Sequence, residues 1–162
     1  MENKWAIVGL GNNKEEYTNT YHNIGFLAVD AFKSLCDLPG VVFYKPDSLM
    51  NNGGPVIVSW LNKQGIKPSN LILVHDDTDI LQGGYKIDFN VSSAGHNGVK
   101  SLITSLGTQE FYRVRVGVRP EEEKIRLKAG DFVLKKIKNK KIFNSVITSA
   151  WEEICTNLLK LS

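Results

Sequence analysis

A polar, glycine-punctuated stretch from Gly9 to Gly25, reading GLGNNKEEYTNTYHNIG, is the feature around which the chain is organised. It follows a short apolar run that starts at Trp5, and it ends where an amphipathic run begins at Ile24. A short apolar run that breaks at Gly-x-Gly is typical of a buried strand passing into a loop. Because ligand crevices of open α/β sheets lie beyond the carboxyl ends of the strands, this stretch is predicted to carry function.

Apolar periodicity predicts that helices and strands alternate along the rest of the chain. Helices are expected over 24–38, 55–62, 99–106 and 142–161, and strands over 41–44, 71–74, 85–91 and 112–117, with a short element at 132–134. The most apolar strand is expected to end abruptly at His75, where the polar run HDDTD begins. This alternation predicts a single three-layer α/β domain over 1–162, in which helices cover both faces of a mostly parallel mixed sheet.

Length and composition are those of an ordinary globular protein, with 42% apolar and 23% charged residues in 162. No apolar run approaches the ~20 residues that span a bilayer, and the first residues show no signal peptide. Cys36 and Cys155 lie far apart without a CxxC pattern, which indicates a reducing compartment. We therefore expect a cytoplasmic protein without a membrane segment.

The formal net charge of +3 is unevenly distributed. Residues 124–141 contain eight Lys or Arg side chains and a single acid, Asp131. Such a basic segment, followed by the C-terminal helix expected over 142–161, favours a polyanionic partner such as nucleic acid through phosphate contacts. A solvated basic face without a partner explains the charge equally well.

Polar side chains gather at the loop positions of the predicted fold. His22 is the natural general base, because an imidazole titrates near neutral pH and can accept a proton from water. Asp76, at the expected end of a strand, can hold the tautomer of that imidazole. The amides of Asn12, Asn51 and Asn97 both donate and accept, which suits binding of a peptide amide or an oxyanion. The structural alternative is a loop histidine without a catalytic role, beside Asp and Asn-Gly residues that only form turns.

Common catalytic motifs are absent from the sequence. Gly9-Leu-Gly11 lacks the third glycine of a dinucleotide fingerprint, and there is no Walker A or Gly-x-Ser-x-Gly sequence. Neither cysteine neighbours a candidate base, so no nucleophile is evident for covalent catalysis. A metal-dependent hydrolytic site remains an alternative, although its spacing matches no standard metal template; its ligands would be His22, His75, Asp76 and His96.

Five ordered blocks within residues 5–118 are specific when taken together. They are GLGN followed by a Tyr and HNIG, MN before a Gly, HDDTD after an apolar strand, GHNG at a helix start, and FYRVRVGV. In this order and nearly this spacing they resemble the bacterial-type peptidyl-tRNA hydrolase family. The resemblance implies an α/β monomer that cleaves the ester between a peptide and the 3′ ribose of tRNA. It also implies no metal, no cofactor and no acyl-enzyme.

The resemblance further implies roles for ten residues. His22 is the base that activates water, Asp76 stabilises its basic form, and Asn12 distinguishes a blocked peptide amide from a free aminoacyl group. Arg115 falls where the family has an arginine that clamps a phosphate. The residues implied in binding the peptide or the tRNA terminus are Tyr17, Leu49, Met50, Asn51, His96 and Asn97.

The sequence also departs from the family. Asn13 replaces a loop proline, Leu49 replaces an aromatic residue, and Asp88 aligns with a second clamp lysine. Asp88 is expected to repel a phosphate, with Lys86 as compensation. A hairpin's length is missing between 38 and 50, and the C-terminal region is shortened. A family member that binds RNA without catalysis, like splicing-related relatives, is therefore a second interpretation, although retention of the whole polar set favours catalysis.

Overall fold

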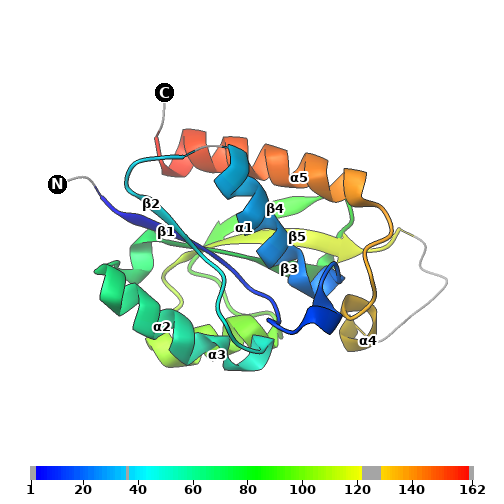
Figure 1. The fold of residues 1–162 in the computed structure, drawn as a ribbon, viewed down its shortest axis with the longest axis horizontal. Coiled ribbons are helices and arrows are strands. Elements are labelled where there is room, and N and C mark those ends of the chain that lie inside the picture. The colour runs from blue at the N-terminus through cyan, green and yellow to red at the C-terminus, as the bar shows by residue number, and fades with distance from the viewer. Residues whose placement is uncertain (1–2, 36, 122–128, 161–162) are drawn as a thin grey trace.

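The computed structural model describes residues 3–35, 37–121 and 129–160, and within these ranges helices flank a five-stranded sheet (Figure 1). The strands are β1 (Trp5–Gly9), β2 (Val41–Tyr44), β3 (Leu71–Leu81), β4 (Tyr85–Phe89) and β5 (Tyr112–Arg119). The α-helices are α1 (Ile24–Leu35), α2 (Gly53–Gln64), α3 (Asn97–Leu106), α4 (Ala129–Val133) and α5 (Lys140–Glu153). Single 3-10 turns lead into α1 at Tyr21–Asn23 and into α2 at Met50–Asn52.

The strand order in the sheet is β2-β1-β3-β5-β4. β1 pairs in parallel with both β2 and β3, and β3 pairs in parallel with β5. β4 is an antiparallel edge strand beside β5. Helices α1 and α5 cover one face of the sheet, whereas α2 and α3 cover the other (Figure 1). The predicted single α/β domain with a mostly parallel mixed sheet is therefore confirmed.

Alternating side chains of β3 separate two apolar cores. Ile72 and Val74 belong to the core under α1 and α5, and Leu71 and Leu73 belong to the core under α2 and α3. All four side chains are fully buried. Because successive residues of a strand face opposite sides, a strand that is covered on both faces reads as an unbroken apolar run. This explains why 71–74 is the most apolar strand in the sequence.

The prediction that this strand ends at His75 is wrong. β3 continues through the polar run to Leu81, and His75, Asp76 and Asp77 pair with β5 in regular parallel register. These three polar residues are also buried, each at most 8% exposed. The polar residues indicated a loop, but hydrogen bonds from other elements satisfy many of their polar groups, so the hydrogen-bonded ladder between β3 and β5 continues through these residues. The acids are therefore carried on a strand of the sheet and not on a loop.

The ends of other elements differ more modestly from the prediction. α1 ends at Leu35, and β4 ends at Phe89, where 38 and 91 were expected. α5 begins earlier, because the Asn139 side chain caps it by accepting a hydrogen bond from the third residue of the first turn. It ends at Glu153 and is followed by one wide π-helical turn, Ile154–Leu158. The helix expected over 55–62 is present as α2.

Part of the basic segment expected over 124–141 lies outside the described residues, namely Lys124, Arg126 and Lys128. The described lysines at 135, 136, 138, 140 and 141 are exposed and lie between α4 and the start of α5. Among the helices of the described ranges, none is both long enough and apolar enough to cross a bilayer.

Candidate active site

A cavity of about 650 Å³ opens beyond the carboxyl end of β1 and along the second half of β3. The loop after β1, the turns before α1 and α2, the loop before α3, and α4 complete its wall. Arg115 does not line the cavity but is linked to it through a hydrogen bond to Asp77, which does. The other nine residues expected from the sequence all line it: Asn12, Tyr17, His22, Leu49, Met50, Asn51, Asp76, His96 and Asn97.

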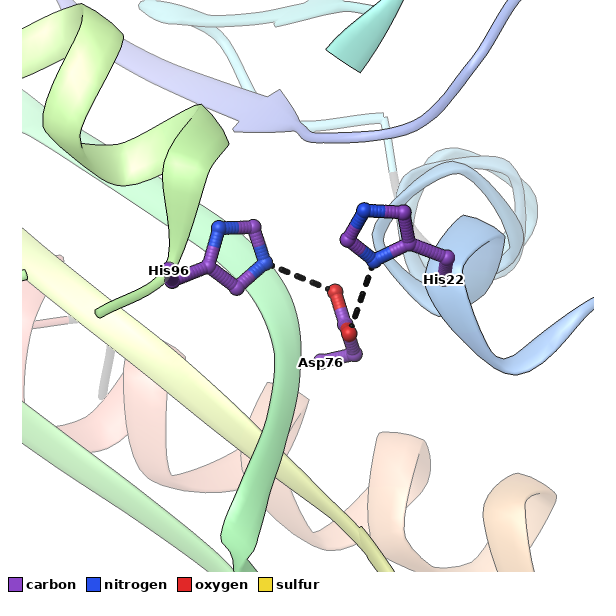
Figure 2. Close-up of side chains that lie close together, drawn as sticks. All are labelled: His22, Asp76 and His96. Atoms are coloured by element: carbon purple, nitrogen blue, oxygen red, sulfur yellow. Dashed lines mark hydrogen bonds and ion pairs between the residues drawn. The ribbon is translucent and has the colours of Figure 1, made fainter. Parts of the chain in front are cut away.

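Three of these side chains meet within the cavity: His22, Asp76 and His96 (Figure 2). Nδ1 of His22 lies 2.9 Å from Oδ2 of Asp76, and Nε2 of His96 lies 2.8 Å from Oδ1 of the same carboxylate. The carboxylate side chain is 3% exposed, whereas the His22 side chain is 17% exposed. A buried carboxylate thus orients an imidazole that a substrate can still reach.

The start of α3 fixes the tautomer of His96. His96 is the N-cap residue of this helix, and its Nδ1 accepts a hydrogen bond from the backbone N–H of Val99 at 3.3 Å. Because Nδ1 is the acceptor, the ring proton of neutral His96 sits on Nε2, from which it is donated to Asp76. Asp76 then accepts a second N–H from Nδ1 of His22. This leaves the lone pair of Nε2 of His22 on the side of the ring turned away from Asp76 (Figure 2).

Asp76 is held in its ionised form. Burial opposes ionisation, but the charges and hydrogen bonds of His96 and His22 outweigh it and keep the pKa of Asp76 well below its usual range. A permanent negative charge beside His22 stabilises the imidazolium that forms when this ring takes a proton.

His75 lies beside this group but is not part of it. Its Nδ1 donates to the backbone oxygen of Asp76 at 2.8 Å, and burial together with the neighbouring His96 keeps its pKa well below the usual value. The expected metal set therefore lacks His75. The ligand atoms of His22, Asp76 and His96 do lie within 4.8 Å of one another. A metal on Nε2 of His96 would, however, move its proton to Nδ1, opposite the N–H of Val99, so the α3 cap disfavours metal binding here.

Asn12 and Asn23 join the loop after β1 to the turn that carries His22. The Asn12 backbone N–H donates to Oδ1 of Asn23 at 2.7 Å, and Nδ2 of Asn23 donates to the Asn12 backbone oxygen at 3.0 Å. Oδ1 of Asn12 accepts the backbone N–H of Met50 at 2.6 Å. Within the described part of the chain the Nδ2 amide of Asn12 makes no hydrogen bond, so it is a donor available to a substrate. Sequence reasoning assigned Asn23 no role of its own, although this residue lies in the predicted functional stretch and follows His22 directly in the HNIG block.

Close backbone packing sets the position of the His22 turn relative to β3. The backbone N–H of Leu10 donates to the oxygen of Val74 at 2.9 Å, and Gly25 of α1 packs directly on both residues. A Cβ atom on Gly25 would lie 2.6 Å from the Leu10 nitrogen and would also overlap the Val74 oxygen. The start of α1 can therefore approach the strand that carries Asp76 only with a glycine at this position.

Arg115 is engaged by two carboxylates. Its Nε donates to Oδ2 of Asp77 at 2.8 Å, and its Nη1 donates to Oδ2 of Asp88 at 2.7 Å. Although burial disfavours the charged guanidinium, these two partners raise the pKa of Arg115. Asp88 was expected to act as a repelling charge near a phosphate, but it is paired with Arg115 itself. Sequence reasoning did not anticipate Asp77, whose contact depends on the parallel register of β3 and β5.

A second arginine of β5 anchors the loop that leads to His96. Arg113 is almost fully buried, and its Nη2 donates to the backbone oxygen of Ser92 at 2.6 Å. Burial, followed by the charge of Arg115, lowers the pKa of Arg113, but a guanidinium remains protonated at physiological pH. The start of α3, with His96, is therefore tied to the sheet by both Arg113 and Asp76.

An imidazole oriented by a buried carboxylate, inside a polar cavity at one end of a parallel sheet, is the arrangement of a hydrolytic enzyme that activates water. Comparisons with known proteins define the class further. The family model described as Peptidyl-tRNA hydrolase matches residues 6–161. The chain belongs to this family and is a hydrolase that acts on ester bonds.

Relatives resemble the chain over most of its length. A peptidyl-tRNA hydrolase of a Sulfurihydrogenibium species is 34% identical over 174 aligned positions, which cover 96% of this chain and 90% of that protein. One from Caldicellulosiruptor saccharolyticus is 38% identical and covers 90% and 86%. The crystal structure of peptidyl-tRNA hydrolase from Acinetobacter baumannii has a TM-score of 0.85 over 99% of this chain and 91% of that chain. At 24% identity, this likeness shows the shared fold.

Proposed function

We propose that this protein cleaves the ester bond between a peptide and the tRNA 3′ ribose with a water molecule that His22 activates. One observation carries the assignment of the base. Nδ1 of His22 is bonded to a buried, ionised Asp76, so its Nε2 is left as a proton acceptor on a ring that lines the cavity. Among the described residues that line the cavity, the other imidazole is His96, and both of its nitrogens are already engaged.

The proposed reaction proceeds without a covalent intermediate. Water gives a proton to Nε2 of His22 while its oxygen attacks the ester carbonyl carbon, which yields a tetrahedral intermediate. Collapse of this intermediate breaks the bond to the ribose oxygen, and the ribose oxygen takes the proton back from His22. The products are a tRNA with a free hydroxyl and a peptide with a free carboxyl group, which ionises by losing its proton to solvent. Asp76 stays ionised throughout and stabilises the transient imidazolium.

The other residues of the site are proposed to bind the substrate. The free Nδ2 donor of Asn12 suits the carbonyl of a blocked peptide amide, as the family resemblance implies. Arg115 is proposed to contact a tRNA phosphate only in competition with its two carboxylates. The remaining cavity residues are proposed to line the path of the peptide or of the tRNA terminus; they are Tyr17, Leu49, Met50, Asn51, His96 and Asn97.

We further propose that the enzyme acts as a cytoplasmic monomer without a metal. The α3 cap on His96, which opposes metal binding through Nε2, supports the metal-free mechanism. The exposed lysines at 135–141 support a tRNA partner, because phosphate contacts need such side chains.

The test is cleavage of an N-blocked aminoacyl-tRNA by the purified protein in EDTA, with His22→Ala as the control variant. We expect turnover by the native protein and loss of at least about 10²-fold in the variant, at an unchanged melting temperature. Near-normal turnover by folded His22→Ala would refute the role of the base. Binding of tRNA without any turnover would favour a non-catalytic RNA-binding protein, and loss of turnover in EDTA would favour a metal-dependent hydrolase.

A further inference from the structure

A groove continues the active-site cavity along the crossing of α2 and α3. It has a volume of about 710 Å³ and shares Asn51, Asn52 and Asn97 with the cavity around His22. Beyond these asparagines it runs between the start of α2, at Pro55, and one face of α3. A polymer that leaves the active site on this side therefore enters the groove directly.

The groove is polar and nearly neutral. Among the described residues that line it, Lys100 is the only charged one, whereas the active-site cavity is lined by Asp76, Asp77 and Asp79. The polar side chains at the shared boundary and on α3 are exposed or half-buried, and most make no hydrogen bond to the described protein; these unpaired side chains are Asn51, Asn52, Asn97, Lys100, Thr104 and Ser105.

The length of the groove matches a few residues of extended chain. Asn97, Lys100 and Thr104 follow one another at intervals of three and four residues, so they line one face of α3. At 1.5 Å per residue this face is about 10 Å long from Asn97 to Thr104. An extended peptide covers about 3.3 Å per residue, so the groove accommodates about three residues.

The floor of the groove is fixed by the contact between its two helices. The backbone N–H of Gly54 in α2 donates to Oγ of Ser101 in α3 at 3.1 Å. A Cβ atom on Gly54 would lie 2.5 Å from the backbone carbonyl carbon of Ser101, so the helices touch backbone to backbone. A preformed groove of this kind loses little conformational freedom when a ligand binds.

We propose that this groove binds the main chain of the substrate's peptide, about three residues beyond those next to the ester, without regard to side-chain identity. The proposal rests on the proposed function. Amide and hydroxyl side chains pair with the N–H and C=O groups of an extended chain. An open groove leaves the side chains of that chain in solvent, which suits a substrate of any sequence.

The charge distribution favours peptide over RNA as the occupant. A groove that tracks a nucleic-acid backbone needs several cationic side chains and aromatic platforms for the bases. Among its described lining residues this groove has Lys100 as its cation and no aromatic side chain. The exposed lysines at 135–141 lie beside α4 and the start of α5, away from α2 and α3 (Figure 1). Peptide and tRNA would thus leave the site on different sides.

The main experiment compares an N-acetyl-aminoacyl-tRNA with an N-acetyl-tetrapeptidyl-tRNA that has the same ester. We expect kcat/KM to be about tenfold higher for the longer substrate, as two main-chain hydrogen bonds would give. Thr104→Trp, which fills the groove, should abolish this preference mainly by raising KM for the longer substrate. Thr148→Trp on the exposed side of α5 is the matched control and should keep it. Equal kcat/KM for both substrates in the native protein would overturn the proposal.

A binding measurement separates this proposal from the proposed function. An N-acetyl-tetrapeptide amide should shift the backbone amide NMR signals of 97–105 in the native protein but not in Thr104→Trp. Absence of such shifts would refute peptide binding in the groove. Inactivity toward both tRNA substrates would refute the proposed function alone, because the shifts would still decide the groove. If Lys100→Glu weakens binding of deacylated tRNA while the peptide causes no shifts, RNA and not peptide occupies the groove.

Discussion

Replacement of Asp76 by asparagine tests how two imidazoles share one carboxylate. Asp76 accepts one hydrogen bond from Nδ1 of His22 and one from Nε2 of His96. An amide of the same size offers one acceptor and one donor. Because the N–H of Val99 fixes the proton of His96 on Nε2, the amide oxygen turns to His96 and the NH₂ turns to His22. Nδ1 of His22 then becomes an acceptor, and its proton moves to Nε2, where the ring no longer accepts one from water.

We expect Asp76→Asn to lower kcat by about 10³–10⁴, the loss seen when a catalytic histidine is held in the wrong tautomer. Such a loss corresponds to about 4–5.5 kcal/mol of activation free energy. A second substitution, His96→Ser, removes the competing donor, while serine remains a good N-cap for α3. The amide oxygen of Asn can then accept from Nδ1 of His22. The double variant should therefore be about tenfold faster than Asp76→Asn alone.

The assay is single-turnover cleavage of an N-blocked aminoacyl-tRNA near neutral pH, with His96→Ser alone as the control and thermal unfolding as the check on folding. Nitrogen-15 NMR of the imidazoles reports directly which nitrogen of His22 carries the proton. Two results contradict the reasoning: an Asp76→Asn protein within tenfold of the native rate, or a double variant no faster than the single one. An unchanged His22 tautomer in Asp76→Asn would refute the mechanism of the loss even if the rate falls.

Three further predictions concern charge, packing and pH. Asp88→Lys frees Arg115 from one carboxylate and should therefore tighten tRNA binding. The salt dependence of binding should become steeper, by an amount equivalent to about two additional phosphate contacts at most. An unchanged slope in binding titrations would place Asp88 off the tRNA path. Gly25→Ala should destabilise the protein by about 3 kcal/mol in urea unfolding because its Cβ meets backbone atoms, whereas Gly53→Ala, where a Cβ has ordinary contacts, should be neutral or stabilising. Because the pKa of Asp76 is lower in the folded than in the unfolded state, its ionisation stabilises the fold above about pH 4, and this stabilisation is lost as pH falls. In the Asp76→Asn variant the free energy of unfolding should therefore depend less on pH in the acid range. The same acid dependence in both proteins would contradict the lowered pKa of Asp76.

The sequence was sufficient to predict the layers of the fold and to place most polar residues of the site at loop positions, but not to show that they meet in one cavity. The layers follow from the alternation of helices and strands, and the possible convergence of the polar loops follows from the rule that carboxyl ends of parallel strands share one edge of a sheet. It failed at His75 to Asp79, because a polar run within a strand is indistinguishable from a loop until its hydrogen-bond partners are known. Those partners come from the turn before α1, the N-cap of α3 and β5, which are far away in the sequence.

Contacts that depend on strand register or on ring orientation were also beyond the sequence. Asp88 reaches Arg115 only because β4 runs antiparallel to β5. In this register Asp88 lies opposite Arg113, and Arg115 is two residues further along β5 on the same face of the sheet. The histidine in GHNG was recognisable as a site residue. Its proton position was not, since it is set by a hydrogen bond from a backbone N–H three residues later.

The first turn of α3 connects the chemistry to the binding surface. His96 closes this turn as its N-cap and, through the same ring, donates to the carboxylate that orients His22, the proposed base. The next residue, Asn97, borders both the cavity and the groove along α3. Any shift of this helix start would therefore move a donor to Asp76 and the boundary of the proposed peptide path together. Arg113, which holds the preceding loop at Ser92, therefore supports both features, although its burial leaves two guanidinium nitrogens without a hydrogen-bond partner among the described residues.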